Sequence, residues 1–458
     1  MLVVASDIHL SDETVGAVVS DKTFALFASR LRELAYQASW RAGGRYDPVR
    51  EVDIILLGDI LDPLQSTLWF EKSPGQEGYV RPWHDPQSEL FVRKVAEITR
   101  AILQKNRAAV DVLKKLSQGD GEGIRLPPAD RRGKPALYTR ERVTPRVRIY
   151  YMVGNHDWYY HLPGKAYDAI RAEIIEAMGL DNLPGPFPHG PEDAGALGET
   201  FERYRLVARH GDRYDPMSYN PRAGRDSATL ADVYTLEVLY RFPHEVNLQL
   251  GDELPPMLLQ GIQRMINVRP LLATPLWLFD QVRRHGASKA HYGQVKTMWD
   301  TVCEDFLSLE PLRNSQFAAP VSRNVLRLIF GLSKRAPFST VATISNLLRR
   351  YMPQEHISIA RFAHQESAIR AGRADFVTYG HTHSHEVVSL EQRVQDVQQS
   401  GQVYINTGAW ATFYDYYHRS AAAGEQKTRP MHLLTCVALY QEGERQGRRY
   451  ENWWANFA

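Results

Sequence analysis

"VDIILLGDILD", residues Val52 to Asp62, begins with a mostly aliphatic and β-branched run and continues through Gly58 to Asp59 and Asp62. An apolar run of this length before a glycine is typical of a buried strand. Two similar runs lie on either side of it, "LVVAS" at residues 2–6 and "VRIYYMVG" at 147–154. Between the first two runs, "DKTFALFASRLRELAYQA" at 21–38 repeats apolar residues at helical spacing. This alternation of strands and helices predicts an α/β architecture in layers.

Further along the chain we expect one long amphipathic helix, which carries Phe91 to Leu116 on one face, and then a loop at 118–146. Two more strands, "YRLVAR" and "DFVTYG", end before His210 and His381. About 160 residues of mostly helical pattern separate them, which is too long for an ordinary connection and indicates an insertion. We expect the C-terminal runs "EVVSL", "QVYINTGA" and "HLLTCVALYQ" to be antiparallel strands that close the sheet.

The composition limits the class of protein. The 458 residues include 55 basic and 53 acidic ones, and a net charge of +2 argues against a nucleic-acid binder that uses its whole surface. Cys303 and Cys436 are the two cysteines, with no CxxC pair, which is typical of a reducing compartment and argues against thiolate metal ligands. No basic region precedes the first apolar run, and no apolar stretch reaches the roughly 20 residues that cross a bilayer. We therefore expect no signal peptide, no spanning helix and a cytoplasmic location.

Each apolar run ends in polar residues that are suited to binding a ligand. The endings are Asp7-Ile8-His9, Gly58-Asp59-Ile60-Leu61-Asp62, Gly154-Asn155-His156-Asp157, His210-Gly211-Asp212 and Gly380-His381-Thr382-His383. Ligands of open α/β sheets bind at the carboxyl ends of the strands. If the strands run in a common direction, these side chains therefore meet at one rim of the domain. The glycines before Asp59, Asn155 and His381 allow the tight turns that a crowded site requires.

The residue types at these ends indicate a metal site. Carboxylate, imidazole and amide oxygen, without thiolate, suit Mn²⁺, Fe, Zn²⁺ or Co²⁺. The candidate ligands are Asp7, His9, Asp59, Asn155, His210, His381 and His383. They are too many for one ion, but they suit two ions that share a bridging carboxylate and clamp a phosphoryl group. No nucleophile-elbow serine and no Walker-type loop occurs in the chain.

Taken singly, these residues also have structural interpretations. Asp7 and Asp59 could each cap a helix, Asn155 could occupy a turn, and His210 could be a core histidine. Asp62 precedes Pro63, as in many turns. The order in which the motifs occur together favours the metal site. We expect His161, Asp212, Asp215 and His385 to be loop or supporting residues.

The five ordered motifs resemble those of the calcineurin-like metallophosphoesterases over residues 1–212 and 373–410. The resemblance implies a two-sheet α/β sandwich flanked by helices. We therefore expect the core to occupy residues 1–212 and 373–458 and a large helical cap to occupy 213–372. It also implies a metal-dependent phosphohydrolase, in which a metal-bound hydroxide attacks a phosphodiester or pyrophosphate bond.

The resemblance assigns a role to each candidate. One metal, for which we expect Mn²⁺, with Fe, Zn²⁺ or Co²⁺ as alternatives, is held by Asp7, His9, Asp59 and His383. The second is held by Asp59, Asn155, His210 and His381, so that Asp59 bridges the pair. His156 is the implied catalytic histidine, which stabilises the transition state or protonates the leaving oxygen, and Asp62 orients it.

The motifs restrict the reaction type more closely than they restrict the substrate. "HGDRYD", the helical insertion and "GAW" at 408–410 resemble the UDP-diacylglucosamine pyrophosphohydrolases, but those enzymes usually carry arginine where this chain has His156. A nuclease of the same superfamily, or a catalytically silent scaffold, is the alternative. Basic residues outnumber acidic ones between 281 and 350, and "RPLLATPLWLFDQVRR" at 269–284 combines Trp277 and Phe279 with arginines. Besides the phosphate-ester substrate, nucleic acid and a lipid or membrane surface therefore remain open as partners.

Overall fold

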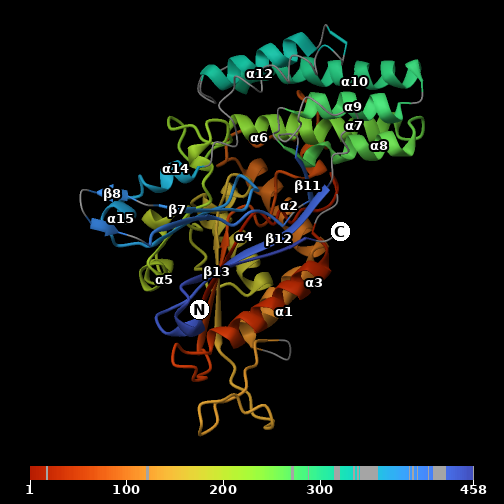
Figure 1. The fold of residues 1–458 in the computed structure, drawn as a ribbon. Coiled ribbons are helices and arrows are strands. Elements are labelled where there is room, and N and C mark those ends of the chain that lie inside the picture. The colour runs from red at the N-terminus through yellow and green to blue at the C-terminus, as the bar shows by residue number, and fades with distance from the viewer. Residues whose placement is uncertain are drawn as a thin grey trace.

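A computed structural model of the chain describes residues 1–16, 19–119, 123–269, 273–286, 288–313, 320–333, 336–337, 340, 359–390, 392–394, 397–399, 401–410, 412–415 and 430–456. Helices and strands alternate along these ranges, and the strands form two mixed sheets and a small two-stranded sheet (Figure 1). The predicted α/β class is therefore confirmed. No helix within these ranges is long and apolar enough to cross a membrane.

The first sheet contains seven strands, and three parallel strands form one side of it. β1 pairs with β2 and β2 with β3 in parallel register, as the three apolar runs predict, whereas β12 pairs with β1 in the antiparallel direction. The order is β3-β2-β1-β12-β11-β5, and β13 also pairs with β12. The strands are β1 (Leu2–Ala5), β2 (Glu51–Leu57), β3 (Arg146–Met152), β5 (Val268–Arg269), β11 (Thr412–Asp415), β12 (Pro430–Leu439) and β13 (Tyr450–Asn456).

The second sheet has the order β4-β6-β10-β7. Its strands are β4 (Leu206–Ala208), β6 (Phe376–Tyr379), β7 (Glu386–Ser389) and β10 (Val403–Asn406); β8 (Gln392–Val394) and β9 (Val397–Gln399) form the small separate sheet. The prediction that the C-terminal strands are all antiparallel is wrong for β10, which runs parallel to β6. β7 runs antiparallel to β10, and β10 lies between β6 and β7, so the chain re-enters the sheet in the direction of β6.

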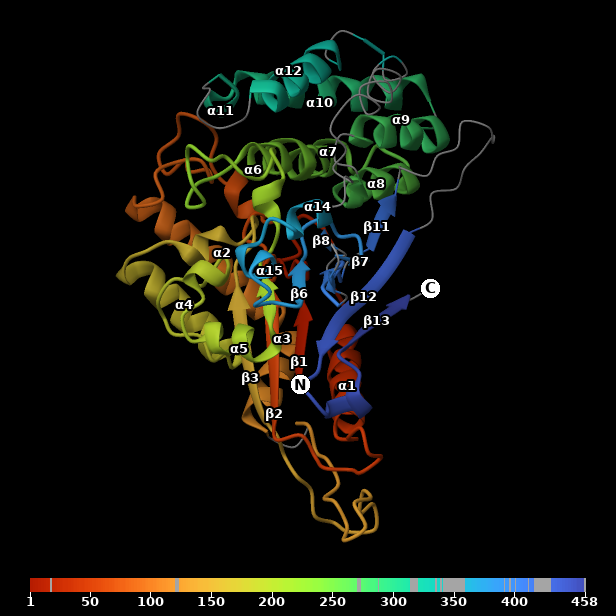
Figure 2. The same ribbon diagram turned by 60° about the vertical axis from the view of Figure 1, so that its left-hand side comes forward.

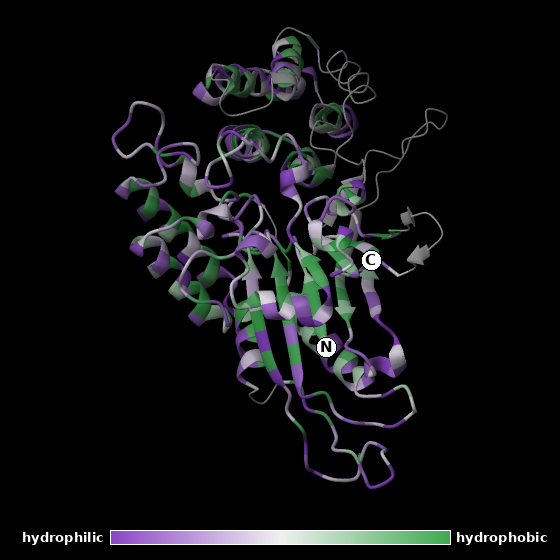
Figure 3. Cartoon of the chain, turned by 90° about the vertical axis from the view of Figure 1, so that its left-hand side faces the viewer, coloured by the Kyte–Doolittle hydropathy of each residue, from purple (hydrophilic) through white to green (hydrophobic). Residues whose placement is uncertain are grey.

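The two sheets pack face to face. Leu2 and Val4 of β1 and Ile55 of β2 lie in one buried cluster with Phe376 of β6 and Ile405 of β10. Because side chains alternate across a strand, the intervening residues of β1 and β2 face the opposite side and pack against helices. The strands of the first sheet are mostly hydrophobic, and the outer helices carry many hydrophilic residues (Figure 3).

Helices α1 to α4 pack on the outer face of the first sheet. They are α1 (Asp21–Ala38), α2 (Glu89–Lys105), α3 (Arg107–Gln118) and α4 (Lys165–Met178). The prediction of one long helix from Phe91 to Leu116 is wrong, because the chain breaks at Asn106 between α2 and α3. The buried amide of Asn106 donates to the carbonyls of Ser11 and Ile102 at 2.7 and 2.8 Å. The contact of Asn106 with Ser11, which is distant in the sequence, ends α2.

The described part of 213–372 is mostly helical. Its helices between residues 230 and 333 lie beyond the carboxyl ends of the parallel strands, whereas residues 359–369 pack against the second sheet (Figures 1 and 2). Its helices are α6 (Leu230–Tyr234), η5 (Thr235–Tyr240), α7 (Arg241–Leu250), α8 (Pro256–Gln263), η6 (Arg264–Asn267), α9 (Thr274–His285), α10 (Lys289–Ser308), α11 (Glu310–Arg313), α12 (Pro320–Ser333), α14 (Ala360–Ala363) and α15 (Ser367–Arg370). Residues of α6 and η5 belong to the same buried cluster as the helices of the core. The buried ion pair of Arg81 with Glu237, at 2.8 Å, ties the two parts together.

The remaining segments are short. They are α5 (Leu197–Tyr204), η1 (Thr67–Phe70), η2 (Trp158–His161), η3 (Pro191–Asp193), η4 (Asp212–Tyr214) and η8 (Glu444–Gly447). The predicted loop at 118–146 extends from the end of the molecule opposite the insertion (Figure 1). Of the stretch "RPLLATPLWLFDQVRR", residues 270–272 lie outside the described residues, as do several parts of the basic region 281–350.

Candidate metal centre

The polar residues after the parallel strands meet at one rim. β1, β2, β3, β4 and β6 all point toward the insertion, so the turns that follow them come together there (Figure 2). All nine residues that the sequence predicts for the site lie in these turns, and contacts connect every one of them to another. We call this group of nine residues the rim site.

The backbone of the rim site is held in an uncommon conformation. Five of its residues have positive φ: Asp7 (53°), His9 (52°), Asp59 (53°), His381 (68°) and His383 (58°). Non-glycine residues rarely adopt this region, and each costs about 1–3 kcal/mol. The turns direct both polar residues of a motif such as Asp7-x-His9 into the same space. The glycines allow the turns to approach each other closely. A side chain on Gly154, for example, would collide with the carboxylate of Asp59.

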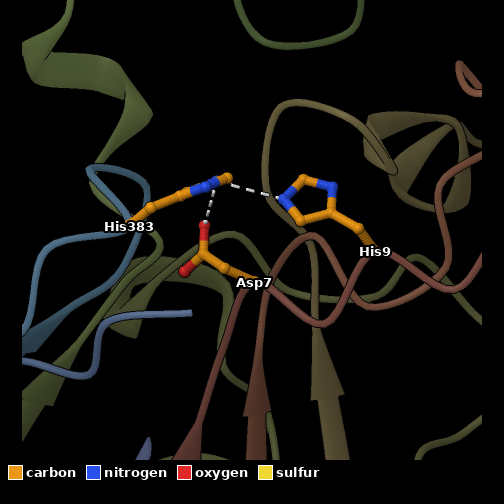
Figure 4. Close-up of side chains that lie close together, drawn as sticks. All are labelled: Asp7, His9 and His383. Atoms are coloured by element: carbon orange, nitrogen blue, oxygen red, sulfur yellow. Dashed lines mark hydrogen bonds and ion pairs between the residues drawn. The ribbon is translucent and has the colours of Figure 1, made fainter. Parts of the chain in front are cut away.

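One half of the rim site consists of Asp7, His9 and His383 (Figure 4). Nε2 of His383 lies 3.4 Å from Oδ1 of Asp7 and 3.1 Å from Nε2 of His9. Nε2 of His9 is also 3.9 Å from Oδ2 of Asp59. These ligand atoms converge on one point from three separate segments of the chain.

The other half is built around Asp59 and His210. Nε2 of His210 lies 3.1 Å from Oδ2 of Asp59 and 3.9 Å from Oδ1 of Asp7. Nδ1 of His381 lies 2.9 Å from Oδ1 of Asn155, and its backbone N–H donates to the carboxylate of Asp7. Asp59, which is 1% exposed, contacts histidines of both halves.

The hydrogen bonds of two histidines fix the nitrogen that faces the site. Nδ1 of His210 lies 3.0 Å from the carbonyl oxygen of Leu57, so this nitrogen carries the proton. In the neutral ring, Nε2 then presents a lone pair to the carboxylate of Asp59. His381 is held similarly, because its Nε2 faces Oδ2 of Asp215 at 3.1 Å and its Nδ1 faces an amide oxygen. Lone pairs that oppose oxygen atoms repel unless a proton or a metal cation lies between them.

The charges of the site favour such a cation. Burial opposes a charge on His210, but Asp59 and Asp7 outweigh it and raise the pKa of this histidine well above its usual value. Burial raises the pKa of Asp7, and neighbouring Asp59 raises it further, although His210 opposes both effects. Two carboxylates that share a buried space need positive charge near them. The residues present therefore have the chemistry and the orientation to hold divalent metal ions.

His156 and Asp62 form a pair beside the ligand groups. Nδ1 of His156 lies 2.9 Å from Oδ2 of Asp62, and Nδ1 of His9 lies at the same distance from that oxygen. The other oxygen of Asp62 accepts a hydrogen bond from the N–H of Gln65, so the carboxylate also holds its own turn. Burial opposes a charge on His156, but Asp62 and Asp59 outweigh it and raise its pKa to about 10. With 17% of its side chain exposed, a charged His156 can meet an anionic group that enters the site.

No protein-family model matches this chain. A comparison with curated proteins found no match either.

Three aspartates support the site, and sequence reasoning missed one of them, Asp232. Asp215, which we expected to be a loop or supporting residue, accepts a hydrogen bond from His381. Asp232 of α6 is 1% exposed, and its negative charge acts to raise the pKa of His156. Asp157 follows His156 and joins two turns of the rim. The motif at 154–157 includes Asp157, and "HGDRYD" includes Asp215, although nothing local identifies His381 as its partner. No local pattern points to Asp232.

Asp157 accepts three hydrogen bonds while fully buried. Its donors are the N–H of Gly154 at 2.5 Å, the N–H of Ile60 at 3.0 Å and the hydroxyl of Tyr151 at 2.6 Å. The carboxylate therefore holds the turn after β2 against the turn after β3.

We expect Asp157→Ala to lower the free energy of unfolding by about 3 kcal/mol or more, because each buried donor left without an acceptor costs about 1–3 kcal/mol. Asp157→Asn keeps one acceptor oxygen and should lose less. Urea unfolding measures both, with Asp47→Ala, at an exposed position, as the control. An unchanged transition for Asp157→Ala would show that these hydrogen bonds do not hold the rim together.

The other predicted supporting residues lie outside the ligand groups. Asp212 pairs with Arg225 at 2.8 Å, and His385 is partly exposed without a contact to a ligand group among the described residues. The third histidine of "HTHSH" is therefore separate from the other two. His161 belongs to a different cluster, which is described below.

Proposed function

We propose that this chain is a divalent-metal-dependent phosphoesterase of the calcineurin-like metallophosphoesterase type, which hydrolyses a phosphodiester or pyrophosphate bond. The observation that carries the proposal is the orientation of the imidazoles around two buried carboxylates. Nε2 of His210 faces Asp59, and Nε2 of His9 faces a second imidazole nitrogen at 3.1 Å. This arrangement suits cations between the side chains.

The proposed ligand sets follow the two halves of the rim site. One ion would be held by Asp7, His9, Asp59 and His383, and the other by Asp59, Asn155, His210 and His381. Mn²⁺ is the expected metal, and Fe, Zn²⁺ and Co²⁺ are the alternatives for this set of nitrogen and oxygen ligands. When bound, such a pair of cations polarises the phosphoryl group and makes water a better nucleophile.

The protein residues would supply orientation and a proton. Asp62 fixes the ring of His156 through Nδ1, which leaves the other ring nitrogen available to the substrate. A charged His156 would stabilise the negative charge of the transition state or donate its proton to the leaving oxygen. Asp215 fixes His381 through Nε2, as an outer carboxylate does for many ligating histidines.

The helical insertion indicates the substrate less clearly than the rim site indicates the reaction. Trp277 of α9 is 3% exposed, and its Nε1 donates to the carbonyl of Gly261 at 2.7 Å. This residue packs in the interior and does not offer a surface to an apolar tail. Arg283 and Arg284 of the same helix are exposed on the outside. We therefore propose the bond that is cleaved and leave the rest of the substrate to experiment.

A hydrolysis screen tests the proposal. The purified chain would be stripped of metal, reloaded with Mn²⁺ and offered bis-p-nitrophenyl phosphate, nucleoside diphosphate conjugates and single-stranded DNA. We expect hydrolysis of at least one of these substrates that chelation removes and Mn²⁺ restores. Cleavage of DNA alone, with a steep loss on adding salt, would favour the nuclease. A folded, metal-loaded protein that cleaves none of them would contradict the proposal and favour a silent scaffold.

A further inference from the structure

A second cluster of potential ligands lies apart from the rim site. It consists of His161 at the end of η2, His189 in the loop before η3, and Asp226 in the segment that leads to α6. The rings of His161 and His189 are 4.1 Å apart between centroids. Oδ1 of Asp226 lies 3.8 Å from Nε2 of His161 and 4.0 Å from Nε2 of His189. We call these three residues the His161 cluster.

His189 is the unusual member of the cluster. It is 4% exposed, and neither of its ring nitrogens has a hydrogen-bond partner among the described residues. A buried polar group without a partner costs about 1–3 kcal/mol, and such groups are rare in native proteins. Burial, and then the charges of Arg225 and His161, lower its pKa well below the usual value. The ring is therefore neutral, which is the form that binds metals.

His161 is oriented as metal-ligating histidines usually are. Its Nδ1 lies 2.8 Å from the carbonyl oxygen of Phe187, so Nδ1 carries the proton and Nε2 presents its lone pair to the cluster. The loop that carries His189 is fixed by Asp193, whose two oxygens accept the N–H groups of His189 and Gly190 at 3.0 and 2.9 Å. The ring of His161 and the backbone of His189 are thus held in place by the core.

The two nearby arginines have carboxylate partners, although Nε and Nη1 of Arg225 are buried without a hydrogen-bond partner among the described residues. Arg225 donates to both oxygens of Asp212 at 2.8 and 3.0 Å. Arg209 pairs with Glu192 and Glu366 at 2.9 and 2.8 Å. Asp226 has 47% of its side chain exposed and no arginine or lysine partner among the described residues, so it can move to meet a ligand.

We propose that His161, His189 and Asp226 bind one divalent metal ion of the zinc type, separate from any metal at the rim site. Two imidazoles, one carboxylate and an open fourth position suit Zn²⁺ in tetrahedral coordination. Ligand atoms around such an ion are roughly 3.3 Å apart for bonds of about 2.0 Å, so the two distances from Asp226 need to shorten by about 0.5 to 0.7 Å. The ion would link the beginning of the insertion, which carries Asp226, to the core loops that carry the two histidines.

Metal stoichiometry tests this proposal directly. The chelator-stripped full-length chain would be dialysed against Zn²⁺ alone, and the bound metal would be counted by mass spectrometry. We expect Asp226→Asn and His189→Gln each to bind one equivalent less than the unmodified chain. Asp252→Asn, an exposed aspartate of the insertion, is the matched control and should lose none. Because the readout is a difference of one equivalent, it holds whether or not the rim site takes up metal.

Cobalt and phosphate distinguish the remaining outcomes. Co²⁺ in a tetrahedral site should give visible absorption bands that Asp226→Asn removes and Asp59→Asn retains. Circular dichroism checks that each variant is folded, and the partial exposure of Asp226 makes that variant the safer one. Equal metal content in the unmodified chain and in Asp226→Asn would overturn the proposal. Binding of inorganic phosphate that Asp226→Asn strengthens, without any change in Zn²⁺ content, would assign the cluster to an anion and overturn it as well.

Discussion

Asp59→Asn is expected to abolish hydrolysis, with a loss of at least about 10³-fold, the upper end of what the loss of one hydrogen bond to a transition state costs. The same variant should bind less metal at the rim site. Asp59 is buried, and its Oδ2 lies near both His9 and His210, one from each half of the rim site, so its carboxylate is the one placed to bridge two ions. An amide supplies no negative charge, and two cations would then face each other with less screening.

The control for Asp59→Asn is Asp53→Asn on the same strand. Asp53 is also buried, but it pairs with Arg148 at 2.7 Å, away from the rim. This control should lose stability and keep its metal and activity. Activity would be measured with bis-p-nitrophenyl phosphate and metal content by mass spectrometry. Full activity of Asp59→Asn, with full metal content, would rule out the bridging role.

His156→Ala is expected to keep the metal of the rim site and to lose most turnover. A side chain that donates a proton or stabilises charge in the transition state contributes roughly 10²- to 10⁴-fold. His156 contacts Asp62 through its ring and Asp59 through its backbone N–H, so its ring is not one of the proposed ligands. The loss should therefore appear in kcat, while the metal content stays unchanged.

Two further variants make the His156 result specific. Asp62→Asn should lower kcat in the same direction, because the amide holds the ring of His156 less firmly. His385→Ala changes a histidine of the same "HTHSH" stretch that lies outside the ligand groups, and it should leave both quantities unchanged. If His156→Ala loses its metal together with its activity, His156 is structural and the proposed role is wrong.

Local sequence patterns predict much of the frame of the site. β1, β2 and β3 are mostly apolar, with charged residues only near the beginning of β2 and β3, and each is followed within a few residues by glycine or by a polar ligand type. Strands of this kind reach the same rim whenever they are parallel, so the positions of Asp7, Asp59 and Asn155 follow from local information. The glycines and their turns follow in the same way.

The rest depends on contacts between distant parts of the chain. The break between α2 and α3 comes from the bond of Asn106 to Ser11, which no helical period reveals. The direction of β10 depends on which strands it lies between. Asp215 contacts His381 across more than 160 residues, so a pattern of neighbours cannot indicate its role. His161 and His189 are 28 positions apart, in no recognised ligand spacing.

Anomalous X-ray diffraction from crystals grown with Mn²⁺ would test the central claim most directly. The account predicts two anomalous peaks at the rim site, one among Asp7, His9, Asp59 and His383 and the other among Asp59, Asn155, His210 and His381. Both peaks should lie within bonding distance of the carboxylate of Asp59. A map with no peak among these residues, from protein that hydrolyses no phosphate ester in the presence of Mn²⁺, would contradict the account.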